Sequence, residues 1–357
     1  ATEVWRSASL RYKFGAERSG LTQATGGGAM RQVQIDEFGG PEVLRLVEAA
    51  DPRPGPGQVV VRAAAAGITF VETQVRAGRP PWPGPGPALP AVLGNGIEGE
   101  IISVGAGADG SLLGRRVVTA TGGLGGYAEQ AAVGAGDPVP APAGLPRGAA
   151  LAMLADGRTA VALARAAAIT GADAVLVTAA AGGVGSLLVQ LARRAGARQV
   201  IAAASSERKL ALAASLGADA VVDYTAAGWA GRLRELTGGH GAGGLDVAFD
   251  GIGGEVSAAV AALVRPGGRF LAYGAASGAF ADAAAISGRG ITLITGRGLA
   301  RSPAENRALV EEALALAAAG ILRPVIGQVH PLAAAGDAHA AIEARVTTGK
   351  TILIPSP

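Results

Sequence analysis

The chain has 357 residues, of which 49% are hydrophobic, and its formal net charge is +3. This length allows two domains of ordinary size. The absence of cysteine excludes disulfides, thiolate nucleophiles and zinc sites with thiolate ligands, and none of the three histidines has a partner at helical ligand spacing. No apolar run reaches the ~18 residues of a membrane span, and no basic run with interleaved aromatics points to nucleic acid. We therefore expect a cytoplasmic protein without a bound metal.

Residues 1–29 have weak periodicity and end near three glycines, Gly26, Gly27 and Gly28. They lack the apolar core of a secretory signal. We expect a flexible tail, an upstream start or a remnant of the expressed sequence, with a transit peptide as the alternative. The predicted fold begins at Met30.

From Met30 to about residue 150, β-like segments alternate with turns rich in glycine and proline. Strands are predicted at 58–68, 99–105 and 115–121. The segment 78–90 contains too much proline for a helix or a central strand, so it is predicted to be a surface loop or a lid over a site.

From about residue 155, strands alternate with helices through short connections, which is typical of a parallel sheet covered by helices on both faces. Ser206 is the expected N-cap of one of these helices. The predicted strands are 174–178, 199–204, 220–224, 245–250 and 268–274, and the helices are 186–196, 206–218, 228–239 and 255–264.

The last part of the chain contains two helical segments, 302–320 and 337–346, and a terminal strand, 350–355. Because a six-stranded doubly wound unit is already complete without it, the terminal strand is expected to return to the first domain.

A glycine-rich turn joins the strand 174–178 to its helix, with the spacing Ala179-x-x-Gly182-x-x-Gly185. Glycines let the backbone approach a pyrophosphate, and the amides and dipole of the helix favour its negative charge. The turn predicts dinucleotide binding, and the alternative is a tight strand–helix turn without a ligand. The residues expected at the cofactor here are Ala181, Gly182, Gly183, Val184 and Gly185.

The end of the second strand indicates which dinucleotide is bound. NAD-binding units place a carboxylate there, whereas this chain has Ser205 and Ser206 followed by Arg208 and Lys209. Hydroxyls and cations would hold a 2′-phosphate that a carboxylate would repel. The pattern predicts NADPH, and the alternative is that the two cations belong to a solvated helix start.

Several segments together resemble the zinc-independent quinone oxidoreductases of the medium-chain dehydrogenase/reductase superfamily. They include "VLVTAAAGGVGSLLVQLARRAGA", "LGADAVVDY", "DVAFDGIGG", "PGGRFLAYG", "GGPEVLRL" and "EARVTTGKTILIP". The resemblance implies an α/β protein in which a β-rich GroES-like catalytic domain (30–153 and 299–357) accompanies a doubly wound, parallel-sheet Rossmann domain (154–298).

The resemblance also implies roles for individual residues. Lys209, Tyr224 and Arg345 match family residues near the NADPH 2′-phosphate. Two loops match those that line the nicotinamide, and their residues are Asp250, Ile252 and Gly253 together with Gly274, Ala275 and Ser277.

Two positions depart from the family. Thr69 stands where relatives often carry an asparagine near the nicotinamide ribose, and Gln74 stands where they often carry a tyrosine in the substrate pocket. Thr69 retains one hydroxyl donor, but Gln74 has no phenolic proton to give. These two residues are the catalytic candidates.

The resemblance implies hydride transfer from NADPH to a quinone without a metal. An α,β-unsaturated ketone or aldehyde is the close alternative, with backbone amides or Thr69 stabilising charge on its oxygen. A sensor that binds NADPH without turnover is a third possibility, because fold alone does not fix function. The apolar segment 290–298 is a candidate edge strand for a homodimer.

Four aromatic or histidine residues allow two interpretations each. Trp82 and Tyr127 would either line the substrate cleft or pack in the core. His240 is more readily a solvated loop residue than a base, and His330, which precedes a proline, is interpreted as a structural turn residue.

Overall fold

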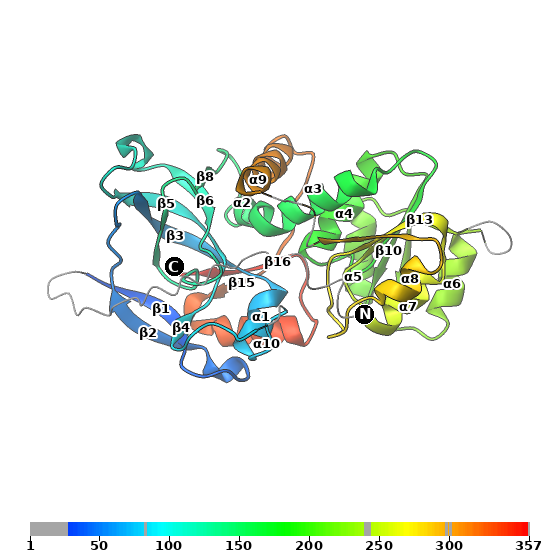
Figure 1. Ribbon diagram of the computed structural model, residues 1–357, viewed down its shortest axis with the longest axis horizontal. Coiled ribbons are helices and arrows are strands. Elements are labelled where there is room, and N and C mark those ends of the chain that lie inside the picture. Colours follow the sequence, from blue (N-terminus) through cyan, green and yellow to red (C-terminus); the bar gives the residue numbers. More distant parts are fainter. Residues whose placement is uncertain (1–27, 82–83, 239–243, 297–298, 300–301, 356–357) are drawn as a thin grey trace. The chain divides into compact units, whose positions relative to one another are not determined.

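The computed structural model describes residues 28–81, 84–238, 244–296, 299 and 302–355 (Figure 1). Trp82, His240 and almost all of the predicted tail lie outside the described residues. The chain divides into two compact units. Their described parts are residues 156–313 with 322–324, and residues up to 155 with 314–321 and those from 325 onward.

The first unit is built on a parallel six-stranded sheet in the order β11-β10-β9-β12-β13-β14. This is the doubly wound arrangement that the alternating pattern predicts. Every residue of β9 and β12 is buried, as expected for central strands covered on both faces. The strands are β9 (Ala174–Val177), β10 (Gln199–Ala204), β11 (Ala220–Asp223), β12 (Leu245–Asp250), β13 (Val264–Ala272) and β14 (Thr292–Thr295).

Helices accompany these strands, and all except those at 158–167 and 283–287 were predicted from the sequence. They are α3 (Arg158–Ala167), α4 (Gly183–Arg194), α5 (Glu207–Ser215), α6 (Trp229–Leu236), α7 (Gly254–Ala261), α8 (Ala283–Ser287) and α9 (Pro303–Ala318). Ser206 is the N-cap residue of α5, but its side chain makes no capping hydrogen bond. Within the unit, α9 is tied to α3 by an Arg165–Glu312 ion pair and by a 3.0 Å bond from Arg158 to Asn306. Residues up to 313 therefore pack with this unit, whereas the expected boundary at 298 remains a prediction.

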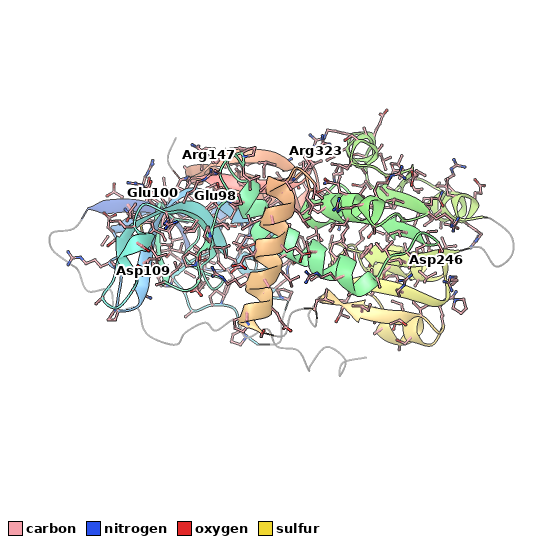
Figure 2. All side chains as sticks on the ribbon, turned by 90° about the horizontal axis from the view of Figure 1, so that it is seen from above. Glu98, Glu100, Asp109, Arg147, Asp246 and Arg323 are labelled. Carbon is pink, nitrogen blue, oxygen red and sulfur yellow. The ribbon has the colours of Figure 1, made fainter. Side chains whose placement is uncertain are left out.

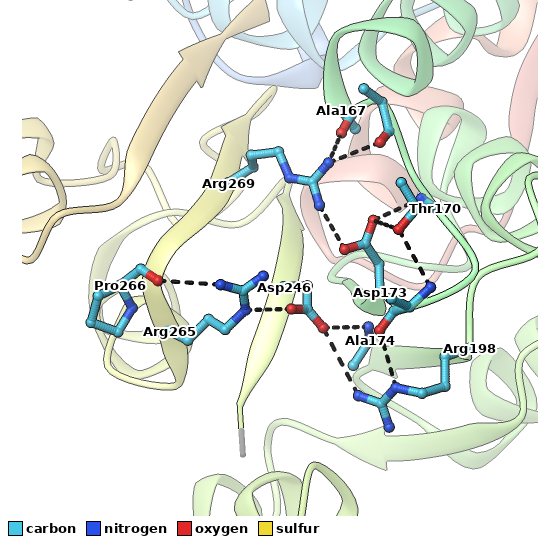
Figure 3. Close-up of polar contacts among 11 residues, drawn as sticks. Ala167, Thr170, Asp173, Ala174, Arg198, Asp246, Arg265, Pro266 and Arg269 are labelled. Atoms are coloured by element: carbon cyan, nitrogen blue, oxygen red, sulfur yellow. Dashed lines mark hydrogen bonds and ion pairs between the residues drawn. The ribbon is translucent and has the colours of Figure 1, made fainter. Parts of the chain in front are cut away.

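Ion pairs and hydrogen bonds connect neighbouring strands at the end of the sheet where the strands begin (Figure 3). Asp246 accepts the amide of Ala174 at 2.7 Å and pairs with Arg265, while Asp173 pairs with Arg269 at 2.7 Å. Burial opposes ionisation of Asp173, but bonds from Thr170 and the Arg269 guanidinium hold its pKa below the ordinary value. Ligands of such sheets bind at the opposite edge, where the strands end, so these charges are structural.

The second unit is β-rich. A three-stranded sheet has the order β2-β1-β4, and a seven-stranded sheet has the order β15-β16-β3-β5-β6-β8, with β7 also paired to β3. The strands are β1 (Ala29–Ile35), β2 (Arg45–Ala50), β3 (Gln58–Ile68), β4 (Ala91–Val92), β5 (Gly96–Val104), β6 (Arg116–Ala120), β7 (Gln130–Gly134), β8 (Val139–Pro140), β15 (Ile326–Pro331) and β16 (Lys350–Ile354). Its α-helices are α1 (Phe70–Arg76), α2 (Ala149–Ala152) and α10 (Ala335–Glu343).

The terminal strand returns to the first part of the chain, as the sequence predicts. Strand β16 pairs antiparallel with β3, so that Thr351 lies opposite Ile68 and Leu353 lies opposite Ala66. This pairing brings Lys350, the first residue of β16, next to the end of β3 where α1 begins.

The structure corrects the interpretation of one single residue and favours one of the two alternatives for another. His330 lies within β15 rather than in a turn, because the strand continues to Pro331 and pairs with β16. Tyr127 is fully buried in the hydrophobic core, which favours packing over a place in the substrate cleft.

The described residues of 78–90 contain no helix or strand, in agreement with a loop.

Candidate active site

The glycine-rich turn has the geometry expected of a close-packed strand–helix junction. Ala179 adopts a left-handed conformation with φ of 49°, and its carbonyl accepts the amide of Gly182 at 2.9 Å. Helix α4 then starts at Gly183. A Cβ on Gly185 would overlap the backbone of Ala179, so the helix approaches the turn as closely as only glycine permits. Ala181 is buried, while Gly182, Gly183 and Val184 are partly exposed at the helix start.

An acidic residue lies against this helix start. A Cβ on Gly183 would overlap the carboxylate of Asp156, which follows α2 in a π-helical turn, Met153–Gly157. A negative group is favourable at a helix N-terminus. Sequence reasoning missed Asp156, because nothing in its local pattern links it to residue 183.

The carboxyl ends of β10 and β11 bring the proposed 2′-phosphate residues together. Ala204 lies opposite Asp223 in the parallel pair, so Ser205 and Tyr224 leave the sheet side by side. The ammonium of Lys209 donates to the Ser205 hydroxyl at 3.2 Å. The side chain of Asp223 is engaged by the amide and hydroxyl of Thr225, at 2.8 and 2.6 Å.

Strands β9 and β12, at the centre of the sheet, end in a buried hydrogen-bond network. Asp250 is fully buried and accepts the hydroxyl of Thr178 at 2.8 Å. It also accepts the amides of Ile252 and Gly253, at 3.2 and 3.0 Å. The Thr178 hydroxyl in turn accepts the amide of Gly251 at 3.0 Å. The network fixes the loop after β12 at the point where the strand order reverses, which is where such sheets bind ligands.

The two loops expected at the nicotinamide lie side by side. Ser277 donates its amide to the carbonyl of Ile252 at 2.8 Å, and Gly274 donates to that of Asp250 at 3.4 Å. Gly253 has a φ of 77°, and a Cβ there would overlap the carbonyl of Ala279. A Cβ on Gly274 would lie 2.6 Å from the Gly251 carbonyl. Ala275 is partly exposed next to this pairing, so both loops present mainly backbone.

Arg345 is an exposed residue of the β-rich unit. It follows α10 in a left-handed conformation with φ of 56° and donates its amide to Ile342 at 3.0 Å. Its approach to a cofactor phosphate remains a prediction.

The two catalytic candidates lie on the first turns of α1. Thr69 is the half-buried N-cap, and its amide donates to the Glu72 carboxylate at 2.7 Å. The Thr69 hydroxyl makes a short hydrogen bond to the same carboxylate oxygen. The amide of Asn95 donates to the other oxygen at 3.1 Å. Gln74 is half-buried, and its amide group donates to the Thr73 hydroxyl at 3.1 Å.

Glu72 was missed as a site residue, although the spacing Thr69-x-x-Glu72 is a capping-box signal. Its side chain is 4% exposed. Burial raises the pKa of Glu72 above its ordinary value, while the Thr69 hydroxyl and the charge of Lys350 act in the opposite direction.

A second buried polar group lies close to α1. Arg76 is 1% exposed and pairs with Glu343 of α10 at 2.6 Å. The Tyr127 hydroxyl lies 2.9 Å from Nε2 of His339, whose Nδ1 has no hydrogen-bond partner among the described residues. Burial, together with the charge of Arg76, lowers the pKa of His339 to about 3. His339 is therefore a neutral core residue at neutral pH.

Within the described ranges, no group of three or more histidine, aspartate or glutamate side chains is arranged to hold a metal ion. The helices of the same part of the chain include none that is long and apolar enough to cross a bilayer.

Two family models match the chain. The alcohol dehydrogenase GroES-like domain matches residues 55–143, and the zinc-binding dehydrogenase domain matches residues 183–318. The second family is named for zinc binding, but this chain has no cysteine that could supply a thiolate ligand to zinc.

Individual relatives cover nearly the whole chain. A quinone oxidoreductase of Pseudomonas aeruginosa is 34% identical over 91% of this chain and 99% of its own length. A 2-haloacrylate reductase of a Burkholderia species is 32% identical over 90% and 98%. The solved structure of Escherichia coli quinone oxidoreductase complexed with NADPH has a TM-score of 0.82. It is 29% identical and covers 91% of this chain and 100% of its own. The chain therefore belongs to the quinone oxidoreductase branch of the medium-chain dehydrogenase/reductase superfamily.

Proposed function

We propose that this protein uses NADPH to reduce a quinone by hydride transfer. The observation that carries the cofactor assignment is the bond between Lys209 and Ser205 at the end of β10, where an NAD-binding unit would present a carboxylate. A cation and a hydroxyl at that position fit a 2′-phosphate. Two structural relatives, one from Escherichia coli and one mycobacterial, were solved with NADPH, which supports the same assignment.

The residues of the Rossmann unit fit the rest of the cofactor. The start of α4 offers amides and a favourable dipole to a pyrophosphate. The paired loops after β12 and β13 offer a flat backbone surface to the nicotinamide. When bound, NADPH supplies the hydride. The protein is then required to position the reactants, a role we assign to Thr69 and Gln74.

A quinone needs little acid from the protein, because its reduced oxygens take protons readily from water. This suits a site whose catalytic candidates are a threonine and a glutamine. The 2-haloacrylate reductase relative favours a second candidate, the reduction of a carbon–carbon double bond conjugated to a carbonyl group. Such an acceptor builds charge on its oxygen and benefits from a donor there.

The test is NADPH consumption against benzoquinones, naphthoquinones, enones and 2-haloacrylate, with NADH in parallel. Turnover of quinones with a preference for NADPH is the expected result. Turnover of the conjugated alkenes alone would move the assignment to a double-bond reductase. Tight NADPH binding with no turnover of any acceptor would favour a sensor.

We also propose that the protein is a cytoplasmic homodimer. Strand β14 is the edge of the parallel sheet, and Leu293 and Ile294 in it are only partly buried. An apolar edge of this kind is a template for pairing with a second copy. Sedimentation that shows only monomer at micromolar concentration would contradict the dimer.

A further inference from the structure

The carboxylate of Glu72 receives three hydrogen bonds, and only one of them can reverse its direction. The amides of Thr69 and Asn95 are fixed donors, at 2.7 and 3.1 Å. The Thr69 hydroxyl is both a donor and an acceptor. Its hydrogen is therefore the one part of this arrangement that can turn.

We propose that Glu72 is a positioning residue that sets the direction of the hydrogen bond made by Thr69. While Glu72 is ionised, it accepts the hydroxyl hydrogen, and Thr69 presents only oxygen lone pairs to the reactants. Thr69 then accepts a hydrogen bond from an N–H or O–H group of the cofactor, because a quinone has neither. The identity of those reactants rests on the proposed function, whereas the coupling between Thr69 and Glu72 is a property of the protein alone.

Protonation of Glu72 reverses one bond and preserves the other two. The new carboxyl O–H donates to the Thr69 oxygen, while the same carboxyl oxygen still accepts the Thr69 amide. The hydroxyl hydrogen of Thr69 is then free to turn outward. Only in this state could Thr69 stabilise charge on an acceptor oxygen. A glutamine could not imitate it, because its NH₂ group cannot accept an amide.

Burial raises the pKa of Glu72, and the charge of a neighbouring lysine opposes that effect. Lys350, which is 3% exposed on β16, favours the carboxylate through its charge. Arg76, on the same helix as Glu72, is paired with Glu343 of α10. The remaining two groups are uncharged at neutral pH: His339 of α10 has a pKa of about 3, and burial raises the pKa of Tyr127.

The first experiment needs no cofactor. An infrared titration of the free protein follows the carboxylic acid C=O band of Glu72, which is identified by its loss in Glu72→Gln. In Thr69→Val the carboxylate loses a donor, so the pKa of Glu72 should rise, and Thr69→Ser should restore it. Lys350→Met should move the pKa upward by about one unit or more. An unchanged pKa in both Thr69→Val and Lys350→Met would overturn the proposal.

The second experiment asks whether the reactants sense the same proton. For quinone reduction, kcat/KM should fall on the acid side at the pKa found by infrared, and this limb should move with Lys350→Met. Thr69→Val should lower kcat/KM about fivefold, as for one lost hydrogen bond, and should lack the limb. A limb that survives in Thr69→Val would overturn the proposal. Absence of all turnover in the unmodified protein would instead refute the proposed function, and the infrared result would still decide the role of Glu72.

Glu98 provides a matched control. It is a buried carboxylate of the same unit, on β5 (Figure 2), paired with Arg116 and accepting the amide of Gly148 at 3.0 Å. Glu98→Gln should lower stability without moving either the Glu72 titration or the acid limb. A shift of either in Glu98→Gln would attribute the effect to the general loss of buried charge and would overturn the proposal.

Discussion

Asp250 and Glu72 are buried carboxylates with nearly identical partners and different consequences. Each accepts a threonine hydroxyl and two backbone amides. The partners of Asp250 belong to the ends of two adjacent strands, so its network ties a loop to the sheet. Glu72 lies at a helix start and is also acted on by the charge of Lys350, and burial raises its pKa. The same set of donors therefore fixes a loop in the Rossmann unit, whereas in the β-rich unit it includes a hydrogen bond whose direction depends on the protonation of Glu72.

The two units also use different parts of the chain to build their sites. The Rossmann unit presents backbone, and its close approaches require glycine at positions such as 185, 253 and 274. The β-rich unit presents side chains held by partners distant in sequence, including Glu72 with Lys350 and Arg76 with Glu343. Substitutions should therefore act through steric overlap in the first unit and through charge and hydrogen bonding in the second.

The largest effect is expected from Gly185→Ala. The added methyl group would overlap the backbone of Ala179, so either α4 or the turn must move and the amides at the helix start would lose their positions. NADPH affinity, measured by fluorescence titration, should fall by about a hundredfold or more, the range for a loss of ~3 kcal/mol.

Gly231→Ala is the matched control for that substitution. Gly231 lies within α6, and a Cβ there would meet nothing within 4 Å. Alanine should stabilise this helix by about 0.5–1 kcal/mol in thermal or urea unfolding and leave NADPH binding unchanged. Normal NADPH affinity in Gly185→Ala would contradict the steric account of the Rossmann unit.

The second largest effect is expected at His339 in the β-rich unit, where acid should lower the free energy of unfolding. Its folded pKa of about 3 lies below the ordinary value of 6.5, so the unfolded chain binds the proton more readily. Stability should be unaffected above pH 6.5 and should fall as the pH drops from 6.5 toward 3. Each pH unit in this window costs about 1.4 kcal/mol, or about 2 kcal/mol between pH 7 and 5. Urea unfolding at the two pH values measures the loss.

His339→Gln should remove most of that pH dependence, because glutamine can still bond to the Tyr127 hydroxyl but does not titrate. Glu72 acts with the opposite sign, since its raised pKa means that acid favours the folded state. The difference between the two proteins isolates the histidine. His330→Gln, at a half-exposed residue of β15, is the control. Equal acid sensitivity of the unmodified protein and His339→Gln would contradict a neutral buried histidine.

The contrast between the units also explains what the sequence could and could not reveal. The alternation of strands and helices around a parallel sheet, the strand–helix turn at the glycines and the return of the terminal strand follow from local patterns and were predicted correctly. A period of two or of 3.6 and the position of a glycine are legible within one segment. The Lys209–Ser205 pair was also within reach, since its members are one helical turn apart.

The charge network of the β-rich unit could not be predicted in this way. Lys350 approaches Glu72 only because β16 pairs with β3, and Tyr127 meets His339 only because α10 packs against the same core. Neither pairing leaves a local signal. Tyr127 remained ambiguous from the sequence for the same reason, since nothing near it indicates a buried histidine partner.

Lys209→Ala should have an intermediate effect, confined to one cofactor. Loss of the ammonium next to Ser205 removes a charge-assisted contact to the proposed 2′-phosphate. The KM for NADPH should rise about tenfold, and the KM for NADH should stay the same. Steady-state kinetics with both cofactors measures the ratio. The exposed neighbour Arg208, changed to alanine, should have a smaller effect, and equal effects of the two variants would assign the phosphate to neither residue in particular.

The smallest effect is expected from Gln74→Ala, and it separates the two catalytic candidates. The Gln74 side chain bonds to the neighbouring Thr73 hydroxyl and is half-exposed, so its loss removes a neutral contact and leaves the Glu72 arrangement intact. The KM for the quinone should change by about threefold or less, within the range of one neutral hydrogen bond, and the acid limb should remain. Thr69→Val should instead lower kcat/KM and remove its fall at acid pH, because the Thr69 hydroxyl is hydrogen-bonded to the Glu72 carboxylate. Loss of the acid-side fall in kcat/KM in Gln74→Ala would instead assign that pH dependence to Gln74 and its surroundings. Glu72 would then be a structural carboxylate, as Asp250 is.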